Sequence, residues 1–174
     1  MDEIVKAALK KWPNVPHCYA WLALDARGDW YMRDDRIQAA GTFPQVKGSR
    51  ILHDKLREFI HRNYAADERG CWFFQNGPQR VYVELEAAPW VWRLGRDAQS
   101  LASHTGREAH FESAWVDEHG RLFLATDLGL GIVHTLDMET AADAVERGAW
   151  TPAETRFDAL PGRFGYVLSP AAAR

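Results

Sequence analysis

The chain has little cysteine and no segment suited to entering a membrane. Its 174 residues include only two cysteines, Cys18 and Cys71, which lie far apart in the sequence. We therefore expect two reduced thiols, with a disulfide as the alternative. The first residues, MDEIVKAALKKWPNV, include acidic side chains and form no apolar run long enough for a signal peptide or a membrane span. These features predict a cytoplasmic protein without a membrane partner.

The sequence also lacks any run of like charge. Its net charge is −3, and acidic and basic residues are mixed along the chain. A nucleic-acid partner is disfavoured, because binding to a phosphate backbone relies on clustered Lys and Arg. Hydrophobic residues make up 47% of the chain, which is enough to bury a sizeable core in one domain or two small ones.

The common catalytic and metal-binding motifs are missing as well. The chain contains no nucleophile elbow, no phosphate-binding glycine loop and no paired-cysteine zinc motif. His53 and His61 lie eight residues apart on a predicted helix, two turns from each other, which is too far for one ion unless another segment intervenes. His104 and His110 are separated by a glycine-containing stretch of undefined geometry. We predict neither a metal site nor a cofactor.

The sequence does contain a short motif that occurs three times, as DARGDWYM, DERGCWFF and DEHGRLFL. An aspartate at the first position can cap a turn, and a glycine three residues later can adopt positive φ, as in a type I turn followed by a left-handed residue. Strand-like runs flank each motif, so we interpret all three as hairpin corners and their aspartates as structural rather than catalytic. The pairs are Asp25 with Gly28, Asp67 with Gly70, and Asp117 with Gly120.

The remaining patterns predict an α+β protein. Apolar spacing indicates a first helix that ends at Pro13, a second with Ser49 as its N-cap, and a third that carries Met138 and stops near Gly148. Between them, antiparallel hairpins and a meander are expected, with a last short strand in RFGYVLSP. We expect two similar halves, residues 1–66 and 67–174, with a single compact domain as the alternative.

Several of these runs resemble known families. HCYAWLALDARGDWYMRDD and KGSRILHDKLREFIHRNYAADERGCWFFQNGPQRVYVELEAAPWVWRL look like an uncharacterised proteobacterial family, over most of the chain. The order of GDWYM, RGCWFF, QRVYVELEAAPWVWRL and LFLATDLG is more distantly similar to a second uncharacterised bacterial family. That resemblance implies a fold of repeated α/β motifs and a suggested role in signal transduction. It implies no catalytic residues, and the insertion RIQAAGTFPQVKG departs from it.

One candidate site lies where the second helix is predicted to begin. The stretch consists of Lys47, Gly48, Ser49 and Arg50. Free backbone N–H groups, the positive end of a helix dipole and two cations would together attract a carboxylate or phosphate. The alternative is a plain helix cap with basic neighbours.

A second candidate site is an aromatic wall on two consecutive strands. Arg80 and Tyr82 share a face of one strand, and Trp90 and Trp92 share a face of the next. Together with the carboxylates of Glu84 and Glu86, these side chains would suit a partner peptide or a planar ligand. The alternative is that the tryptophans are core residues.

These observations favour a non-catalytic binding or regulatory module of the cytoplasm, with an unidentified small molecule or protein as its ligand. Two other classes stay open. One is a small enzyme that uses carboxylates such as Glu84 and Asp127, because loops after strands often present catalytic groups. The other is a structural subunit of a larger assembly.

Overall fold

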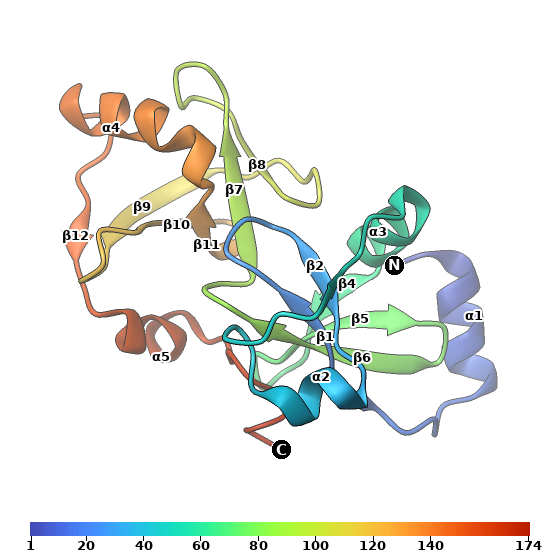
Figure 1. The fold of residues 1–174 in the computed structure, drawn as a ribbon. Helices are drawn as coiled ribbons and strands as arrows, with labels where there is room; N and C mark the ends of the chain where they lie inside the picture. Colours follow the sequence, from blue (N-terminus) through green and yellow to red (C-terminus); the bar gives the residue numbers. More distant parts are fainter. The chain divides into compact units, whose positions relative to one another are not determined.

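The strands form two sheets, one in each of two units into which the chain divides. A computed structural model describes all residues from 1 to 174. The first unit comprises Met1–Asp25, Asp29–Glu86 and Tyr166–Arg174, and the second comprises Ala26–Gly28 and Ala87–Gly165. Figure 1 colours the chain along its length. The main division therefore falls at Glu86, whereas the boundary predicted after residue 66 lies inside the first unit, within a hairpin.

The first unit has one six-stranded mixed sheet. Its strands run in the order β3-β2-β1-β6-β5-β4, and only β1 and β6 pair in parallel. The elements are α1 (Glu3–Lys11), β1 (Cys18–Leu24), β2 (Trp30–Met32), α2 (Asp35–Ala40), β3 (Ser49–Arg50), α3 (Asp54–Arg62), β4 (Tyr64–Ala66), β5 (Trp72–Asn76) and β6 (Gln79–Leu85).

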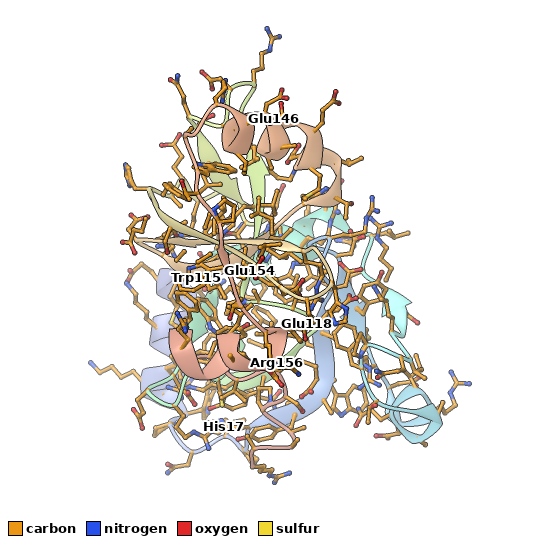
Figure 2. All side chains as sticks on the ribbon, turned by 90° about the vertical axis from the view of Figure 1, so that its left-hand side faces the viewer. His17, Trp115, Glu118, Glu146, Glu154 and Arg156 are labelled. Carbon is orange, nitrogen blue, oxygen red and sulfur yellow. The ribbon has the colours of Figure 1, made fainter.

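The second unit has its own six-stranded sheet, in the order β12-β9-β10-β11-β7-β8. Here β7 pairs in parallel with β11, and β12 pairs in parallel with β9; Figure 2 labels Trp115 of β9 and Glu154 of β12. The strands are β7 (Trp90–Leu94), β8 (Leu101–Ser103), β9 (Phe111–Val116), β10 (Leu122–Thr126), β11 (Gly129–Val133) and β12 (Ala153–Glu154). The helices are η1 (Thr135–Asp137), α4 (Met138–Glu146), η2 (Phe157–Ala159) and α5 (Leu160–Phe164).

The two sheets share one topology. Each contains a hairpin and a later three-stranded meander, and the last meander strand pairs in parallel with the first hairpin strand. The corresponding orders are β2-β1-β6-β5-β4 and β8-β7-β11-β10-β9. The predicted α+β fold with two similar halves is confirmed. The parallel pairs were not predicted, because they join segments far apart in the sequence.

The repeated aspartate stretches form the same turn three times. In each, the backbone N–H of the aspartate donates to the carbonyl four residues later, at 3.0 to 3.1 Å. The backbone N–H of that later residue donates back to the carboxylate, at 2.8 to 3.0 Å. Gly28, Gly70 and Gly120 have φ of 82°, 78° and 73°. The predicted left-handed glycines are therefore confirmed.

A fourth copy of this turn escaped the sequence analysis. In the stretch SHTGR, the N–H of Ser103 donates to the Arg107 carbonyl at 2.8 Å, and the N–H of Arg107 donates to the Ser103 hydroxyl at 3.2 Å. Gly106 has φ of 84°. The hydroxyl thus takes the place of the carboxylate, which is why a search for aspartate missed it.

The helices differ from the prediction in start and number. The expected helix beginning at Ser49 instead starts at Asp54, where the His53 ring accepts the N–H of Leu56 at 3.3 Å. Ser49 and Arg50 form β3, because they pair with β2 at the sheet edge. The helices predicted before Pro13 and from Met138 are present as α1 and α4, whereas α2 and α5 were missed.

Two smaller features complete the chain. The strand predicted in RFGYVLSP is wrong, because α5 occupies its start and the rest is irregular. The irregular part still pairs with other segments of the first unit: the N–H of Val167 donates to the Gly70 carbonyl, and the N–H of Leu85 donates to the Leu168 carbonyl.

Both cysteines are free thiols. None of the helices combines the length and apolar character needed to cross a bilayer.

Candidate functional site

The four residues of the predicted anion site do not surround a helix terminus. The Lys47 ammonium donates to the carboxylates of Asp25, at 2.9 Å, and Glu86, at 3.0 Å. Arg50 donates to Asp29 at 2.6 Å. Both cations are thus matched by carboxylates of the first unit, and the exposed helix N–H groups that motivated the site lie elsewhere, at Asp54. The structure removes the basis for this prediction.

The predicted aromatic wall is also not assembled. Trp90 and Trp92 are 2% and 0% exposed, and their indole N–H groups donate to the carbonyls of Leu128 and Leu124. Their rings stack at 6.1 Å inside the second unit. These contacts show that the core alternative is correct for both tryptophans.

The other half of that wall lies on β6, in the first unit. Tyr82 is buried and donates to Asp67 at 3.0 Å. The Arg80 guanidinium lies over the Phe73 ring, 4.5 Å from its centroid. Both side chains therefore have internal partners.

The two carboxylates of the enzyme alternative belong to different units. Asp127 accepts the backbone N–H of His110 at 2.7 Å, and its other oxygen lies 3.2 Å from the same residue's imidazole Nδ1. These hydrogen bonds hold the pKa of Asp127 below its usual value. Glu84 lies on β6 of the first unit.

Glu84 does, however, line a pocket of about 430 Å³ within the first unit. Parts of the chain that are distant in sequence meet there: β1, the end of β2, α2 with the loop after it, β6 and the C-terminal segment, which Figure 1 shows close to α2. The lining residues are Ala20, Arg33, Gln38, Gly41, Thr42, Phe43, Glu84, Ser169, Ala171 and Ala172.

Arg33 supplies the pocket with a buried positive charge. The residue is only 3% exposed, and its Nε and Nη2 donate to the carbonyls of Val46, at 3.2 Å, and Gly41, at 2.7 Å. No carboxylate oxygen lies within 4.0 Å of the guanidinium, the limit for an ion pair. The Nη1 atom of Arg33 makes no hydrogen bond to the protein. A charge buried without a counter-ion is costly, so this arrangement is typical of a site that receives one.

Glu84 supplies a buried carboxyl group on the same pocket. It is 7% exposed, and its Oε1 accepts the N–H of Ala171 at 3.3 Å. Burial raises the pKa of Glu84, while hydrogen bonds from Ser169 and Ala171 and the positive charge of Arg33 act in the opposite direction. The carboxyl is therefore close enough to Arg33 to feel its charge but is not paired with it.

The backbone at this pocket is strained at one point. Ala20 has φ of 65°, in the left-handed region that side chains avoid, and sits where the pairing of β1 with β6 shifts register between Cys18 and Leu22. Such a conformation costs on the order of 1 kcal/mol, and strain of this kind is concentrated at functional sites.

Sequence reasoning named Glu84 but missed Arg33. Arg33 stands in the run MRDD, where two following aspartates make it look like a paired surface residue. Its burial depends on α2 and the loop 41–46, which lie in the insertion whose structure the resemblance left undefined. Alternation in the sequence indicates only that Arg33 shares a face with Tyr31. The pairing of Tyr31 with Ala23, and of Ala23 with Glu84, then places Arg33 on the face that carries Glu84.

Comparisons with known proteins agree with the resemblance to uncharacterised families. A DUF1285 family protein from Silicibacter pomeroyi DSS-3 is similar in structure, with a TM-score of 0.51 and 15% identity, covering 82% of this chain and 84% of that one. Another from Shewanella baltica OS155 has a TM-score of 0.47 and 16% identity, covering 71% and 91%. The first likeness shows a shared fold. No curated protein matches the chain.

The likeness in sequence is more extensive than the likeness in structure. The family model DUF2944, described as "Protein of unknown function (DUF2946)", matches residues 1–171. The chain belongs to this family.

Proposed function

We propose that the protein is a cytoplasmic, non-catalytic binding and regulatory module whose first unit holds a small anionic ligand at Arg33. The observation that carries this proposal is an arginine that is 3% exposed, lines a pocket and has no carboxylate within ion-pair distance, while two backbone carbonyls orient its guanidinium. An anion in the pocket would provide the missing counter-charge. The planar fork of an arginine favours carboxylate or phosphate oxygens as partners.

The composition of the pocket supports binding rather than acid–base catalysis. Its lining contains one carboxylate, Glu84, and no histidine, cysteine, lysine or tyrosine. A general acid and a general base within reach of one reacting atom are therefore not both present. The volume of about 430 Å³ lies in the range of small-molecule sites.

The segments that form the pocket walls support the regulatory part of the proposal. Residues 38–43 and residues 169–172 are far apart in sequence, and both contribute to the lining. A ligand that contacts both segments would hold them in one arrangement and would shift the population of the chain toward it. The suggested signalling role of the more distant family is compatible with such a device.

The test is a thermal-unfolding titration of the full chain with acetate, citrate and phosphate. A ligand that binds only the folded state raises the melting temperature with saturation, whereas general salt effects rise without it. Arg33→Gln should abolish the saturable part. Arg36→Gln is the matched control, because this arginine lies on α2 with an exposed side chain. A linear response of the wild type to all three anions, or a saturable response kept by Arg33→Gln, would contradict the proposal.

A further inference from the structure

The pocket holds two opposite charges apart. Arg33 and Glu84 both line it, both are more than nine-tenths buried, and no ion pair within 4.0 Å joins them. If they served only to stabilise the fold, direct contact would be favoured, because the mutual attraction of the two charges would offset part of the desolvation cost of each. Both residues line the same pocket, so a ligand that occupies it would lie close to both charges.

Each charged group is fixed in place by neutral partners. The backbone carbonyls of Gly41 and Val46 hold the guanidinium of Arg33 through two of its three nitrogens. The carboxyl group of Glu84 is held by the N–H of Ala171 and by the Ser169 hydroxyl. These contacts orient the groups without neutralising them. The site is therefore preorganised for a ligand that brings both a negative and a positive charge.

We infer that the ligand is a compact zwitterion of the free α-amino acid class, with its carboxylate on Arg33 and its ammonium group on Glu84. This inference rests on the proposed function, because it names the kind of anion that Arg33 binds. A simple anion would satisfy Arg33 but would face the carboxylate of Glu84, whereas a zwitterion compensates both charges at once.

The rest of the lining indicates where the amino-acid side chain would lie. Phe43 contributes an aromatic ring, and Ala20, Ala171 and Ala172 contribute small apolar surfaces. Apolar and aromatic side chains would bury their surface against these walls, which favours binding. We therefore expect leucine and phenylalanine to bind more tightly than glycine.

The experiment compares matched ligands by calorimetric titration of the full chain. Each amino acid is measured beside its des-amino acid and its amine: leucine with 4-methylpentanoate and 3-methylbutylamine, and phenylalanine with 3-phenylpropanoate and phenethylamine. We expect at least one of the two amino acids to bind tenfold or more tightly than its des-amino acid, and the amines not to bind. Des-amino acids that bind as tightly as the amino acids overturn the inference while the proposed function stands. If no ligand in the series binds, the inference also fails. The proposed function fails as well only if the anion titration above shows no saturable response.

Variants of Glu84 separate its contribution from that of Arg33. Glu84→Gln should lower the affinity for the amino acid about tenfold, to that of its des-amino acid, and should leave the des-amino acid unchanged or tighter. Arg33→Gln should abolish binding of both. Glu58→Gln, an exposed position on α3, is the control and should change neither. Equal affinity of wild type and Glu84→Gln for the amino acid contradicts the assignment of the ammonium group.

Folding is monitored for every variant by far-ultraviolet circular dichroism. If Arg33→Gln fails to fold because the loop 41–46 loses its anchor, Ala172→Trp takes its place, since this exposed residue lines the pocket and a large side chain would block it. Blocked binding with a retained melting temperature supports the pocket as the site. Unchanged binding in Ala172→Trp overturns it.

Discussion

The sheets of the two units share one topology, but different side chains lie at the parallel strand pair of each sheet. In the second unit, the parallel pair of β7 and β11 carries Trp90 and Trp92, and a Cβ on Gly131 would overlap the indole of Trp92. In the first unit, the corresponding pair of β1 and β6 places Ala23 beside Glu84, next to a pocket. The shared topology is therefore compatible with indole rings packed at the parallel strand pair of one unit and with a charged pocket beside the parallel strand pair of the other.

This comparison indicates that the candidate site depends on particular side chains and not on the topology, which both units share. Both sheets need the same backbone hydrogen bonds, and both use the same aspartate turn between the first two meander strands, at Asp67 and Asp117. In the first unit, Arg33 and Glu84 are opposite charges that are both buried and do not form an ion pair with each other, whereas the buried Asp117 and Asp137 of the second unit are paired with arginines. Burying charged groups that are not paired with each other destabilises a fold, so the site at Arg33 and Glu84 has a cost in stability.

The largest expected effect on the free energy of unfolding comes from removing the buried Trp92 side chain from the core of the second unit. Trp92→Ala should lower the free energy of unfolding by about 3–5 kcal/mol, because it removes a fully buried indole and leaves a cavity under Gly131. Guanidinium denaturation followed by circular dichroism measures this change. Trp12→Ala is the control, since Trp12 is 51% exposed and should cost less than about 1 kcal/mol. A loss below about 1 kcal/mol for Trp92→Ala would mean that the indole does not fill the core.

The next effect tests whether the repeated turns are energetically equivalent. Asp117 accepts two backbone N–H groups, at 3.0 and 2.8 Å, and the Nε of Arg121 at 2.7 Å. Asp67 accepts two backbone N–H groups, at 3.0 and 2.9 Å, and the Tyr82 hydroxyl at 3.0 Å. Replacing either by Ala should cost about 2–3 kcal/mol, because buried donors lose a charged acceptor.

Ser103→Ala provides the matched comparison for these turns, because its hydroxyl is a neutral acceptor in the same geometry. Its expected cost is about 1 kcal/mol. All three values come from the same denaturation experiment. Costs for Asp67 and Asp117 that differ by more than about 1.5 kcal/mol, or a larger cost for Ser103, would show that the turns are alike in shape only.

The turns could be predicted from the sequence because their hydrogen bonds lie within five residues. An aspartate and a glycine at fixed spacing specify them without reference to the rest of the chain. The helix start at residue 54 was missed because local sequence offered two candidate N-caps. Ser49 and His53 both have side chains that can accept a backbone N–H, and only the pairing of Ser49 with Met32 shows which of them begins the helix.

The pocket could not be predicted, because it depends on contacts across the whole first unit. Leu22 is paired with Val83, and the Ala171 N–H reaches Glu84. Hydrophobic alternation identifies the faces of each strand but not which strands become neighbours. The prediction that Trp90 and Trp92 form a binding wall failed for the same reason. Alternation correctly placed both on one face of the strand, but only the structure shows that this face is buried.

A pH-dependent effect of intermediate size is expected in the first unit. The Trp30 indole N–H donates to Nε2 of His61 at 2.9 Å, which requires the neutral imidazole at that nitrogen. Burial, together with the nearby positive charge of Arg57, lowers the pKa of His61 from 6.5 to about 4. The unfolded chain therefore takes up the proton first as the pH falls. The stability that His61 contributes is complete above pH 6.5 and is lost progressively toward about pH 4.

The measurement for His61 is the free energy of unfolding at a series of pH values between 7.5 and about 4, for the wild type and His61→Gln. Glutamine can accept the indole N–H but does not titrate. The difference between the two proteins should change by ~1–2 kcal/mol across this range, after allowance for solvent screening of a partly exposed group. A difference that stays constant with pH would show that the imidazole titrates normally in the folded state.

The smallest expected effect concerns backbone strain, and it compares the units directly. Ala20 in the first unit and Ala98 in the second have φ of 65° and 60°. Glycine relieves left-handed strain of about 1–2 kcal/mol but loses more entropy on folding, so each Ala→Gly change should stabilise its protein by about 0.5 kcal/mol. Thermal unfolding without ligand should show similar gains. Ala20 lines the pocket, so only Ala20→Gly should also weaken amino-acid binding, through loss of a fixed wall. Equal ligand affinity in both variants would mean that the strain at Ala20 is a property of the β1 bulge and not of the site.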